Sequence, residues 1–335
     1  GAGGKDGSVG RSLGKGPRSP RRVREVAAAA ERTDTCCLIY TSGTGGRPKG
    51  VMLSHGAIIC NCMGAHDVIA RLPGYTEPGE VFLSFLPLSH AYEHTAGQMF
   101  PITIGAEIYY AESLEKLVAN IGEARPTIMT AVPRLYESIY ARILRGLKDA
   151  SPLRQKMFHK AVALGRKRYE DPQSLTFGEK MLDAVLDRLV RTKVQKRFGG
   201  RLKAFVSGGA ALNPEIGTFF LALGVRLLQG YGQTEAAPVI SVNPPELIKI
   251  DTVGLPLKSV EVRLGNDGEI LTRGELVMKG YWNRPEVTAE AIRDGWLHTG
   301  DIGLIDNDGY IKITDRKKDI IVNSGGDNIS PQRVE

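Results

Sequence analysis

The segment Tyr40–Gly50 (YTSGTGGRPKG) has the composition of a loop that binds phosphate groups. Its glycines let consecutive backbone N–H groups face an anion, and Thr41, Ser42 and Thr44 add hydroxyl donors. Lys49 adds a positive charge. The spacing is not that of a Walker A loop, because no glycine-lysine-serine/threonine triplet follows a glycine by four residues, and no Rossmann GxGxxG is present. Taken alone, the segment predicts a phosphate-binding loop or a flexible turn equally well.

Three further polar segments accompany extended apolar runs: Gly230–Glu235 (GYGQTE), His298–Asp301 (HTGD) and Asp315–Asp319 (DRKKD). GYGQTE follows a predicted strand, and HTGD is predicted to lie between two strands. Together with Tyr40–Gly50, and in this order, they resemble the adenylate-forming ligase superfamily of acyl-CoA synthetases, luciferases and peptide-synthetase adenylation domains. The resemblance covers Asp34 to Glu335. Four longer stretches are most similar to the long-chain fatty acyl-CoA synthetase branch: Leu86–Gly97, Phe205–Leu212, Gly274–Trp282 and Asp315–Gly326.

The resemblance implies ATP-dependent activation of a long-chain fatty acid to acyl-AMP and then to acyl-CoA, with release of AMP and pyrophosphate. ATP, Mg²⁺ and coenzyme A as co-substrate are therefore expected. Two alternatives stay open: another acyl- or aryl-adenylating ligase, such as one that loads an acyl carrier protein, and a non-catalytic nucleotide-binding fragment. We also expect the chain to lack the start of the family's large domain and the carboxyl-terminal lobe, which carries an adenylation lysine and much of the coenzyme A contact.

The resemblance also assigns roles to individual residues. Catalytic roles fall to Thr41, Lys49, Glu235 and Arg316. Magnesium is expected on the Thr41 hydroxyl and the Glu235 carboxylate, since this cation prefers hard oxygen ligands. In the family the aromatic residue at Tyr231 stacks on adenine, and Asp301 accepts the ribose hydroxyls. The predicted nucleotide-binding residues are Thr41, Ser42, Gly43, Thr44, Gly45, Gly46, Lys49, Gly208, Gly209, Ala210, Gln229, Gly230, Tyr231, Gly232, Gln233, Thr234, Asp301 and Arg316.

The pattern HxxEH formed by His90, Glu93 and His94 is open to two interpretations. The two histidines are four residues apart and share one helix face, in the order of a zinc-binding motif. The resemblance instead makes this segment a loop that borders the acyl site, with His90 in contact with substrate, and this interpretation is favoured. The resemblance also places Tyr136, after a strand, at an aromatic gate to a fatty-acid tunnel.

The composition is that of a globular protein with one or two sizeable cores, since 42% of the 335 residues are hydrophobic. No apolar stretch approaches the roughly 20 residues that a membrane helix needs, and the amino end lacks the apolar segment of a signal peptide. A cytoplasmic location is expected, with peripheral contact at the inner membrane face as an option. Four crowded cysteines predict reduced, buried thiols rather than a disulfide framework or a zinc site: Cys36, Cys37, Cys60 and Cys62.

The net charge of +7 is unevenly distributed along the chain. Residues 1–31 hold seven basic and three acidic residues in a glycine-rich tail, which we expect to be disordered until a short helix begins near Arg22. Residues 140–203 hold 17 basic and six acidic residues. Some of these basic residues fall between apolar positions of helical spacing: Arg188, Arg191, Lys193, Lys196 and Arg197.

Three interpretations of the basic segment 140–203 stay open. The favoured one is a solvated charged face. The second is attraction to an anionic membrane surface or to the phosphates of coenzyme A. Nucleic acid is the least favoured, because no aromatic residues alternate with the cations as they do in a strand-binding groove.

Apolar runs at 35–40, 81–88, 127–132, 202–207 and 225–229 alternate with segments of helical spacing. This predicts an α/β fold of layered, mostly parallel sheets with helices on both faces. From Asp251, short extended runs separated by turns at 266–268 and 306–309 predict a hairpin-rich β subdomain. The predicted domains are a tail (1–31), a nucleotide- and acyl-binding part (32–250), a β-rich subdomain (251–314), and a hinge with the start of a small lobe (315–335).

Overall fold

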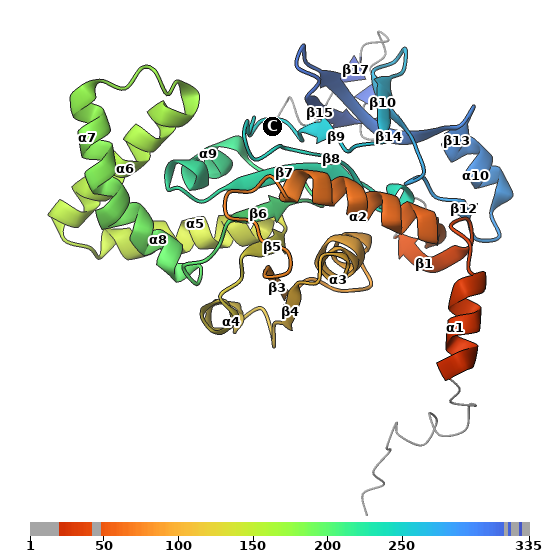
Figure 1. Cartoon of the computed structure of the whole chain (residues 1–335). Coiled ribbons are helices and arrows are strands. Elements are labelled where there is room, and N and C mark those ends of the chain that lie inside the picture. The colour runs from red at the N-terminus through yellow and green to blue at the C-terminus, as the bar shows by residue number, and fades with distance from the viewer. Residues whose placement is uncertain (1–19, 42–47, 318–320, 323–327, 330–335) are drawn as a thin grey trace, which may run out of the picture.

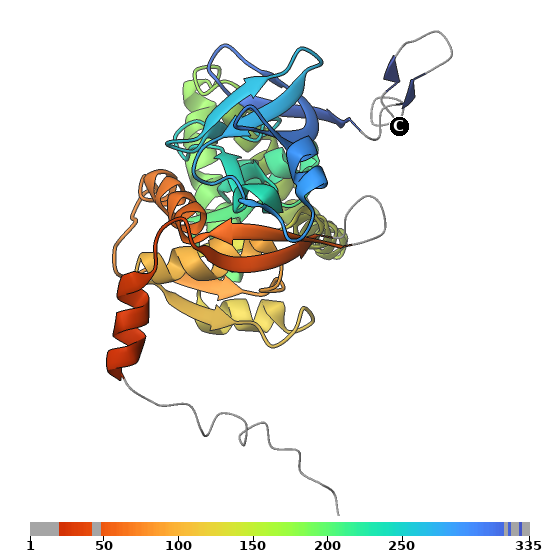
Figure 2. The same cartoon turned by 90° about the vertical axis from the view of Figure 1, so that its right-hand side faces the viewer.

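A computed structural model describes residues 20–41, 48–317, 321–322 and 328–329 (Figures 1 and 2). Three predicted features lie partly outside this range: residues 1–19 of the basic tail, 42–47 of the phosphate loop and 318–319 of the hinge. The predicted short helix near Arg22 is present as α1 (Pro20–Ala29). The predicted domain boundaries stay predictions.

The central sheet has seven strands in the order β4, β3, β5, β6, β7, β8, β9. Their bounds are, in that order, Glu107–Tyr110, Val81–Ser84, Ile128–Ala131, Ala204–Ser207, Leu227–Gly232, Val239–Val242 and Leu255–Pro256. The strands from β4 to β7 pair in parallel, whereas β8 and β9 are antiparallel. The predicted α/β fold with a mostly parallel sheet is confirmed. The sequence did not predict β4, which lies largely exposed at the sheet edge and lacks a buried apolar run.

Consecutive residues of the parallel strands pack into two different cores. Phe82 and Ile128 belong to one core, with α2 (His55–Ile69) and α3 (Phe100–Thr103). Their neighbours Leu83 and Met129 belong to a second core, with the helices from α4 to α9. Because side chains alternate between the faces of a strand, a continuous apolar run is what a sheet covered on both faces requires. The helices are α2 (His55–Ile69), α3 (Phe100–Thr103), α4 (Leu117–Ala124), α5 (Pro133–Lys148), α6 (Pro152–Glu170), α7 (Phe177–Leu186), α8 (Thr192–Arg197) and α9 (Pro214–Ala222).

Helices α6, α7 and α8 form a lobe at one end of the sheet, on the left of Figure 1. A π-helical turn, η3 (Asp187–Arg191), joins α7 to α8. Helix α7 starts at a capping box, in which Thr176 and Glu179 each bond the other's backbone N–H. One basic residue predicted for a charged face is placed differently: the Arg191 side chain is fully buried. The spacing was misleading because a basic residue can fill a core position when buried acceptors meet its guanidinium.

The predicted strand 35–40 is confirmed as β1 (Thr35–Thr41), but its expected place in the mostly parallel sheet is wrong. It pairs antiparallel with β2 (Lys49–Ser54), and β12 (Gly280–Tyr281) completes a separate three-stranded sheet. The last pair of the β1–β2 ladder is Thr41 with Lys49. Strands β1 and β2, consecutive in the chain, therefore form a hairpin. The apolar run predicted a strand correctly, but such a run does not specify the strand's partner.

The predicted hairpin-rich β subdomain is present, in the upper right of Figure 1. Its strands are β10 (Glu261–Leu264), β11 (Glu269–Arg273), β13 (Ile292–Arg293), β14 (Trp296–Ile305) and β15 (Ile311–Arg316), with α10 (Pro285–Ala291) beside them. The predicted turns at 266–268 and 306–309 join β10 to β11 and β14 to β15. HTGD does not lie between two strands, as predicted, but inside β14. Its glycine and polar residues broke the apolar pattern, while pairing with β11 and β15 kept the strand continuous.

The remaining elements are two short strands near the carboxyl end, β16 (Ile321–Val322) and β17 (Asn328–Ile329). Among the described residues, no helix combines the length and apolar character that would let it cross a membrane. All four cysteines are free thiols; Cys60 and Cys62 are buried as predicted, whereas Cys36 and Cys37 are only partly buried.

Candidate functional site

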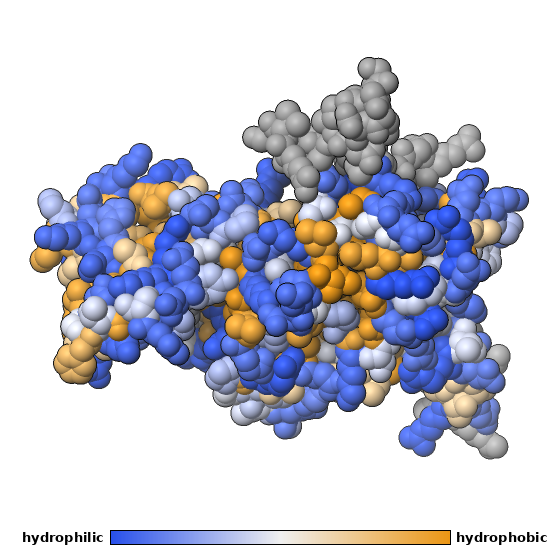
Figure 3. Space-filling view, turned by 90° about the horizontal axis from the view of Figure 1, so that it is seen from above, coloured by the Kyte–Doolittle hydropathy of each residue, from blue (hydrophilic) through white to orange (hydrophobic). Residues whose placement is uncertain are grey.

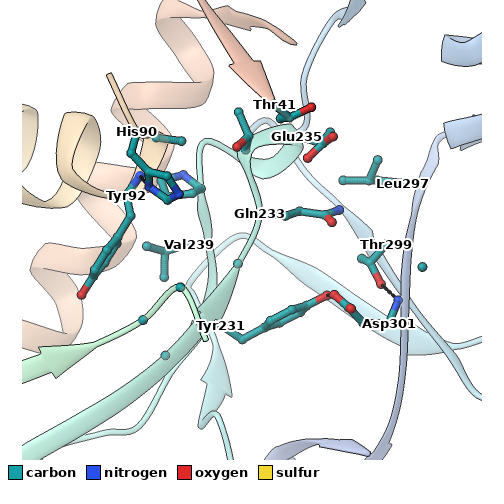
Figure 4. Close-up of a pocket in the computed structure, with 18 of the residues that line it drawn as sticks. Thr41, His90, Tyr92, Tyr231, Gln233, Glu235, Val239, Leu297, Thr299 and Asp301 are labelled. Carbon is teal, nitrogen blue, oxygen red and sulfur yellow. Dashed lines mark hydrogen bonds between the residues drawn. The ribbon is translucent and has the colours of Figure 1, made fainter. Parts of the chain in front are cut away.

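A pocket of about 1050 Å³ lies where the carboxyl ends of β6 and β7 face the β1–β2 hairpin and β14 (Figure 4). In sheets of this kind ligands bind beyond the carboxyl ends of the strands. The structure brings most of the predicted site residues to its wall. They are Thr41, Lys49, His90, Gly208, Gly209, Gly230, Tyr231, Gly232, Gln233, Thr234, Glu235, Asp301 and Arg316.

Tyr231, Asp301 and Arg316 form one connected group in this pocket. The Tyr231 hydroxyl donates to Asp301 Oδ2 at 2.6 Å, and Figure 4 shows it pointing at that carboxylate. Arg316 Nε lies 3.2 Å from Asp301 Oδ1, because the two residues are directly opposed on β14 and β15. Burial, followed by the Asp301 carboxylate, raises the pKa of Tyr231 well above its usual value, so the phenol remains a proton donor.

Lys49, Tyr281 and Glu235 form a second group on the opposite wall. The Tyr281 hydroxyl donates to Glu235 Oε1 at 2.8 Å, and Lys49 Nζ lies 4.6 Å from the centre of the Tyr281 ring. Burial and the nearby Glu235 carboxylate raise the pKa of Tyr281 above its usual value. Glu235 itself lies in a short 3₁₀ helix, η4 (Thr234–Ala236), whose position is tied down by a bond from Met278 N to Glu235 O at 2.8 Å.

The donor set at this wall suits a magnesium ion. The Thr41 hydroxyl and the Glu235 carboxylate line the same pocket, and both are oxygen ligands. Lys49 pairs with Thr41 across the hairpin, so a positive charge accompanies them. Such a combination can neutralise the negative charge of a polyphosphate.

Glycines let the backbone form the floor of the pocket. A Cβ atom at Gly232 would lie 1.9 Å from the carbonyl oxygen of Pro238, so no larger residue fits between β7 and β8. A Cβ atom at Gly208 would lie 3.1 Å from the ring of Tyr92, which is tighter than ordinary contact. Gly209 adopts φ of +81°, a conformation that favours glycine.

Glu269 holds the HTGD segment in place from behind the pocket wall. Its side chain is only 5% exposed, and it accepts a hydrogen bond from Gly300 N at 2.9 Å. Its carboxylate also meets His298 Nδ1 at 3.0 Å and Lys317 Nζ at 3.1 Å. Burial alone would raise the pKa of Glu269, but these three partners outweigh it and lower the pKa. Asp301 is oriented further by Thr299, whose Oγ1 accepts from Asp301 N at 3.1 Å (Figure 4).

Glu93 of the HxxEH pattern points into the core instead of toward a metal. It is fully buried in the π-helix η2 (Glu93–Met99) and accepts from Ser84 Oγ at 2.5 Å and Thr130 Oγ1 at 2.8 Å. Burial raises its pKa in spite of these bonds. In the part of the chain that the structure describes, no group of three or more His, Cys, Asp or Glu residues could hold a metal ion. The zinc alternative for His90 and its neighbours is therefore unsupported.

Among the described residues, three predicted site residues lie outside the pocket wall; residues 42–46 are outside the described range. Tyr136 is fully buried, with ring centres 5.5 Å from Phe205 and 5.8 Å from Phe220. Gln229 is buried and bonds Thr252 O at 2.9 Å, and Ala210 is exposed. Their predicted roles stay predictions.

The sequence missed several pocket residues that the structure identifies. They include Tyr92, Tyr281, Thr299 and Lys317. Tyr281 and Tyr92 lie in stretches that carried the family resemblance, so their membership of GYW and HAYEH was an available signal. Nothing in the sequence pointed to Glu269, which acts through contacts 29 and 48 residues away.

Comparison with known proteins agrees with this geometry. The AMP-binding enzyme family matches residues 6–282. The long-chain-fatty-acid–CoA ligase FadD15 of Mycobacterium bovis is 35% identical over 319 residues, which cover 94% of this chain and 52% of that protein. The peroxisomal long chain acyl-CoA synthetase 6 of Arabidopsis thaliana is also 35% identical over 319 residues, covering 90% of this chain and 44% of that protein. The chain thus spans about half the length of these relatives.

Two solved structures have similar folds. ATP-bound MatB from Rhodopseudomonas palustris has a TM-score of 0.67 and 26% identity, covering 93% of this chain and 56% of that chain. The o-succinylbenzoate coenzyme A synthetase MenE from Bacillus subtilis, in complex with ATP and a magnesium ion, has a TM-score of 0.66 and 25% identity, covering 91% of this chain and 55% of that chain.

Proposed function

This chain belongs to the AMP-binding enzyme family, and from that premise we propose that it forms the nucleotide- and acyl-binding part of an ATP-dependent ligase of long-chain fatty acids and coenzyme A. In this reaction a carboxylate oxygen attacks the α-phosphate of ATP and pyrophosphate leaves. The thiol of coenzyme A then takes the acyl group and AMP leaves. One observation carries the proposal: segments spread from Thr41 to Lys317 line a single pocket of about 1050 Å³.

The adenosine end of the nucleotide is proposed to lie against Tyr231 and Asp301. The hydrogen bond between these side chains holds the phenol ring in one orientation, which suits packing against a flat base. Asp301 would accept the ribose hydroxyls, since a carboxylate offers about four acceptor sites. Arg316, which is 56% exposed at its side chain, can turn toward ribose or phosphate oxygens.

The phosphate end is proposed to lie between the hairpin and η4. Thr41 and Glu235 would hold Mg²⁺, which would neutralise phosphate charge as pyrophosphate leaves. Lys49 would contact phosphate oxygens from the same wall. Tyr281 would act as a positioning residue, because its hydroxyl fixes Glu235 Oε1 and its ring lies under Lys49.

The acyl end is proposed to begin at His90, which lines the pocket beside Tyr92. Tyr136 lies behind that wall, buried between two phenylalanines. If Tyr136 acts as a gate, its ring has to leave this position before a fatty acyl chain can pass. Support for a long-chain substrate comes from FadD15 and from long chain acyl-CoA synthetase 6, each 35% identical to this chain. The structural similarity to MenE, an o-succinylbenzoate coenzyme A synthetase, makes a ligase of another carboxylic acid the second candidate.

Calorimetry of Mg·ATP binding to the full chain tests the nucleotide site. The double variant Thr41→Ala/Lys49→Ala should bind at least about tenfold more weakly, since it removes a hydroxyl ligand and a charge at the phosphates. The matched control is Thr33→Ala/Lys258→Ala, which changes the same residue types at exposed positions away from the pocket. Equal affinities in the two double variants would overturn the site.

The acid substrate is tested separately, by pyrophosphate exchange into ATP in the complete gene product. Exchange that rises with fatty-acid chain length supports the proposal, and Tyr136→Ala should shift the preferred length. Exchange with o-succinylbenzoate but not with fatty acids would favour the second candidate.

A further inference from the structure

Helix α7 carries an apolar stripe on its exposed side. Phe177, Met181, Val185 and Leu189 are 81%, 59%, 51% and 43% exposed. They are four residues apart, so they follow one face of α7 and continue into η3. The opposite face, which includes Leu186, is buried against the helical lobe. Contiguous exposed apolar side chains of this kind mark an interaction surface.

The segment 140–203, which contains this lobe, concentrates the positive charge of the protein. Residues 140–203 carry 17 basic and six acidic residues, a net charge of +11, whereas the whole chain carries +7. The rest of the chain therefore carries −4. Exposed basic residues lie beside and between the apolar ones: Lys180, Arg188, Lys193, Lys196 and Arg197. We call the apolar stripe and these five residues the α7 face. Figure 3 shows apolar and polar side chains mixed at this end of the molecule.

Three acidic residues of the lobe form ion pairs within it: Glu179, Asp183 and Asp187. Asp187 lies in η3 beside the α7 face, is 57% exposed and lies 3.7 Å from Arg191, so one carboxylate stands beside the five basic residues. Glu179 pairs with Lys167 at 2.8 Å, and Asp183 pairs with Arg168 at 2.7 Å and with the buried Arg191 at 2.5 Å. Within the described residues, none of the five basic residues of the α7 face forms an ion pair. Their charge is therefore available to an external partner.

We propose that the α7 face docks on the surface of an anionic phospholipid membrane. A helix that lies in such an interface needs apolar side chains that enter the headgroup boundary, with lysine and arginine at the level of the anionic groups. The α7 face has both features. Nucleic acid fits less well, because Phe177 is the only aromatic residue of the face and stacking needs several.

This inference goes beyond the proposed function, since it concerns a surface apart from the pocket. No residue between 140 and 203 lines the pocket, so docking by α7 would leave the pocket wall uncovered. A lipid surface would also hold acyl chains close to the protein. Vesicle binding requires neither ATP nor a fatty acid, so its failure is distinct from failure of the ligase proposal.

The test is sedimentation of the full chain with vesicles of phosphatidylcholine alone and of phosphatidylcholine with phosphatidylglycerol. Binding is expected only to the anionic vesicles and should weaken as salt rises. Phe177→Ala/Met181→Ala should reduce the partition coefficient by about tenfold, because both side chains lose apolar area at the interface. The matched control is Ile102→Ala/Leu114→Ala, at positions that are 57% and 67% exposed on other elements.

A charge variant separates attraction from insertion. Lys196→Glu/Arg197→Glu should lose anionic binding, whereas Lys258→Glu/Arg284→Glu, with the same charge change elsewhere, should keep most of it. The proposal is overturned if the wild-type chain ignores anionic vesicles or if α7-face and control variants bind alike. It is also overturned if the α7-face variants change self-association in ultracentrifugation instead, since that result would assign the face to a second copy of the chain.

Discussion

Two buried carboxylates meet arginines in this protein, and their surroundings differ. In the helical lobe the Arg191 side chain is fully buried. It bonds Asp183 Oδ1 at 2.5 Å, Ala161 O at 2.9 Å and Ala222 O at 2.8 Å. At the pocket, the Asp301 side chain is 9% exposed, close to the 8% of Asp183. Its partner Arg316, however, is 56% exposed and lines a cavity.

The difference separates a structural ion pair from one that can serve a ligand. A guanidinium whose N–H groups all bond fixed acceptors has none left to bind a ligand. Removing that arginine leaves the acceptors without a hydrogen bond. An arginine at the edge of a cavity can exchange its contacts when a ligand enters. Substitutions in the lobe should therefore act on stability, and substitutions at the pocket should act on nucleotide affinity.

The largest effect is expected for Arg191→Met. This change leaves Asp183 Oδ1 and three carbonyl oxygens without the guanidinium that donates to them, while Arg168 still pairs with Asp183 Oδ2. The loss should cost about 3–5 kcal/mol of unfolding free energy. Urea denaturation measures it. Arg188→Met, at an exposed position of the same lobe, is the control and should stay within about 0.5 kcal/mol of wild type. Similar midpoints for the two variants would remove the structural half of the comparison.

Asp301→Asn should come next and should act on binding. Asparagine keeps the shape and an acceptor for Tyr231, but it loses the charge that strengthens hydrogen bonds from ribose, worth about 1.5–3 kcal/mol. Calorimetry should show Mg·ATP affinity reduced by about tenfold or more. The control is Asp308→Asn, whose side chain is 67% exposed outside the pocket. Loss of stability without loss of affinity would place Asp301 with Arg191 as a structural residue.

Tyr281→Phe sharpens the comparison at the phosphate wall. The variant removes one hydroxyl that donates to Glu235, so the carboxylate is held less firmly and Mg·ATP affinity should fall by about 0.5–1.5 kcal/mol. The affinity for ATP should also depend more strongly on the magnesium concentration, because Glu235 is the proposed magnesium ligand. Tyr310→Phe removes a hydroxyl bond to Leu247 O outside the pocket and should leave affinity unchanged. If Tyr310→Phe weakens binding as much, the effect is one of general stability.

The smallest effect is expected for Glu179→Gln in the lobe, and it should depend on pH. Hydrogen bonds from Lys167 and the Thr176 backbone lower the pKa of Glu179 to about 2, below its ordinary 4.5. A carboxyl with a lowered pKa stabilises the fold above the ordinary value and stops doing so as pH falls toward the folded one. The variant should therefore be less stable than wild type near neutral pH and should converge with it in acid. Thermal unfolding across pH checks this, with Glu170→Gln as control. A constant difference at all pH values would contradict the assignment.

Strands were predicted well wherever local pattern decides them. The strands β3, β5, β6 and β7 follow from short apolar runs, because both faces of these strands are covered. The edge strand β4 was not predicted, because it is largely exposed and has no buried apolar run. The partners of β1 could not be inferred, since an apolar run has the same appearance in either sheet.

The candidate site was predicted through its motif residues and missed through its supports. Thr41, Glu235 and Asp301 stand in recognisable polar segments, and the structure brings them to one pocket. Tyr281 bonds Glu235 across 46 residues, and Glu269 bonds His298, in the same segment as Asp301, across 29 residues. Spacing along the chain carries no information about such contacts.

The sequence by itself determined which chemical groups are available: hydroxyls and a lysine in a glycine-rich segment, a carboxylate after GYGQT, and an aspartate in HTGD. It also determined the alternation of strands and helices, because the side-chain period of each element is local. Only the tertiary structure decided which of the charges face a cavity. Arg191 and Arg316 both have other charged residues close to them in sequence, but long-range packing buries one against fixed acceptors and leaves the other at the pocket edge. Burial depends on residues distant in sequence, so the chain has to fold before a structural charge can be told from a functional one.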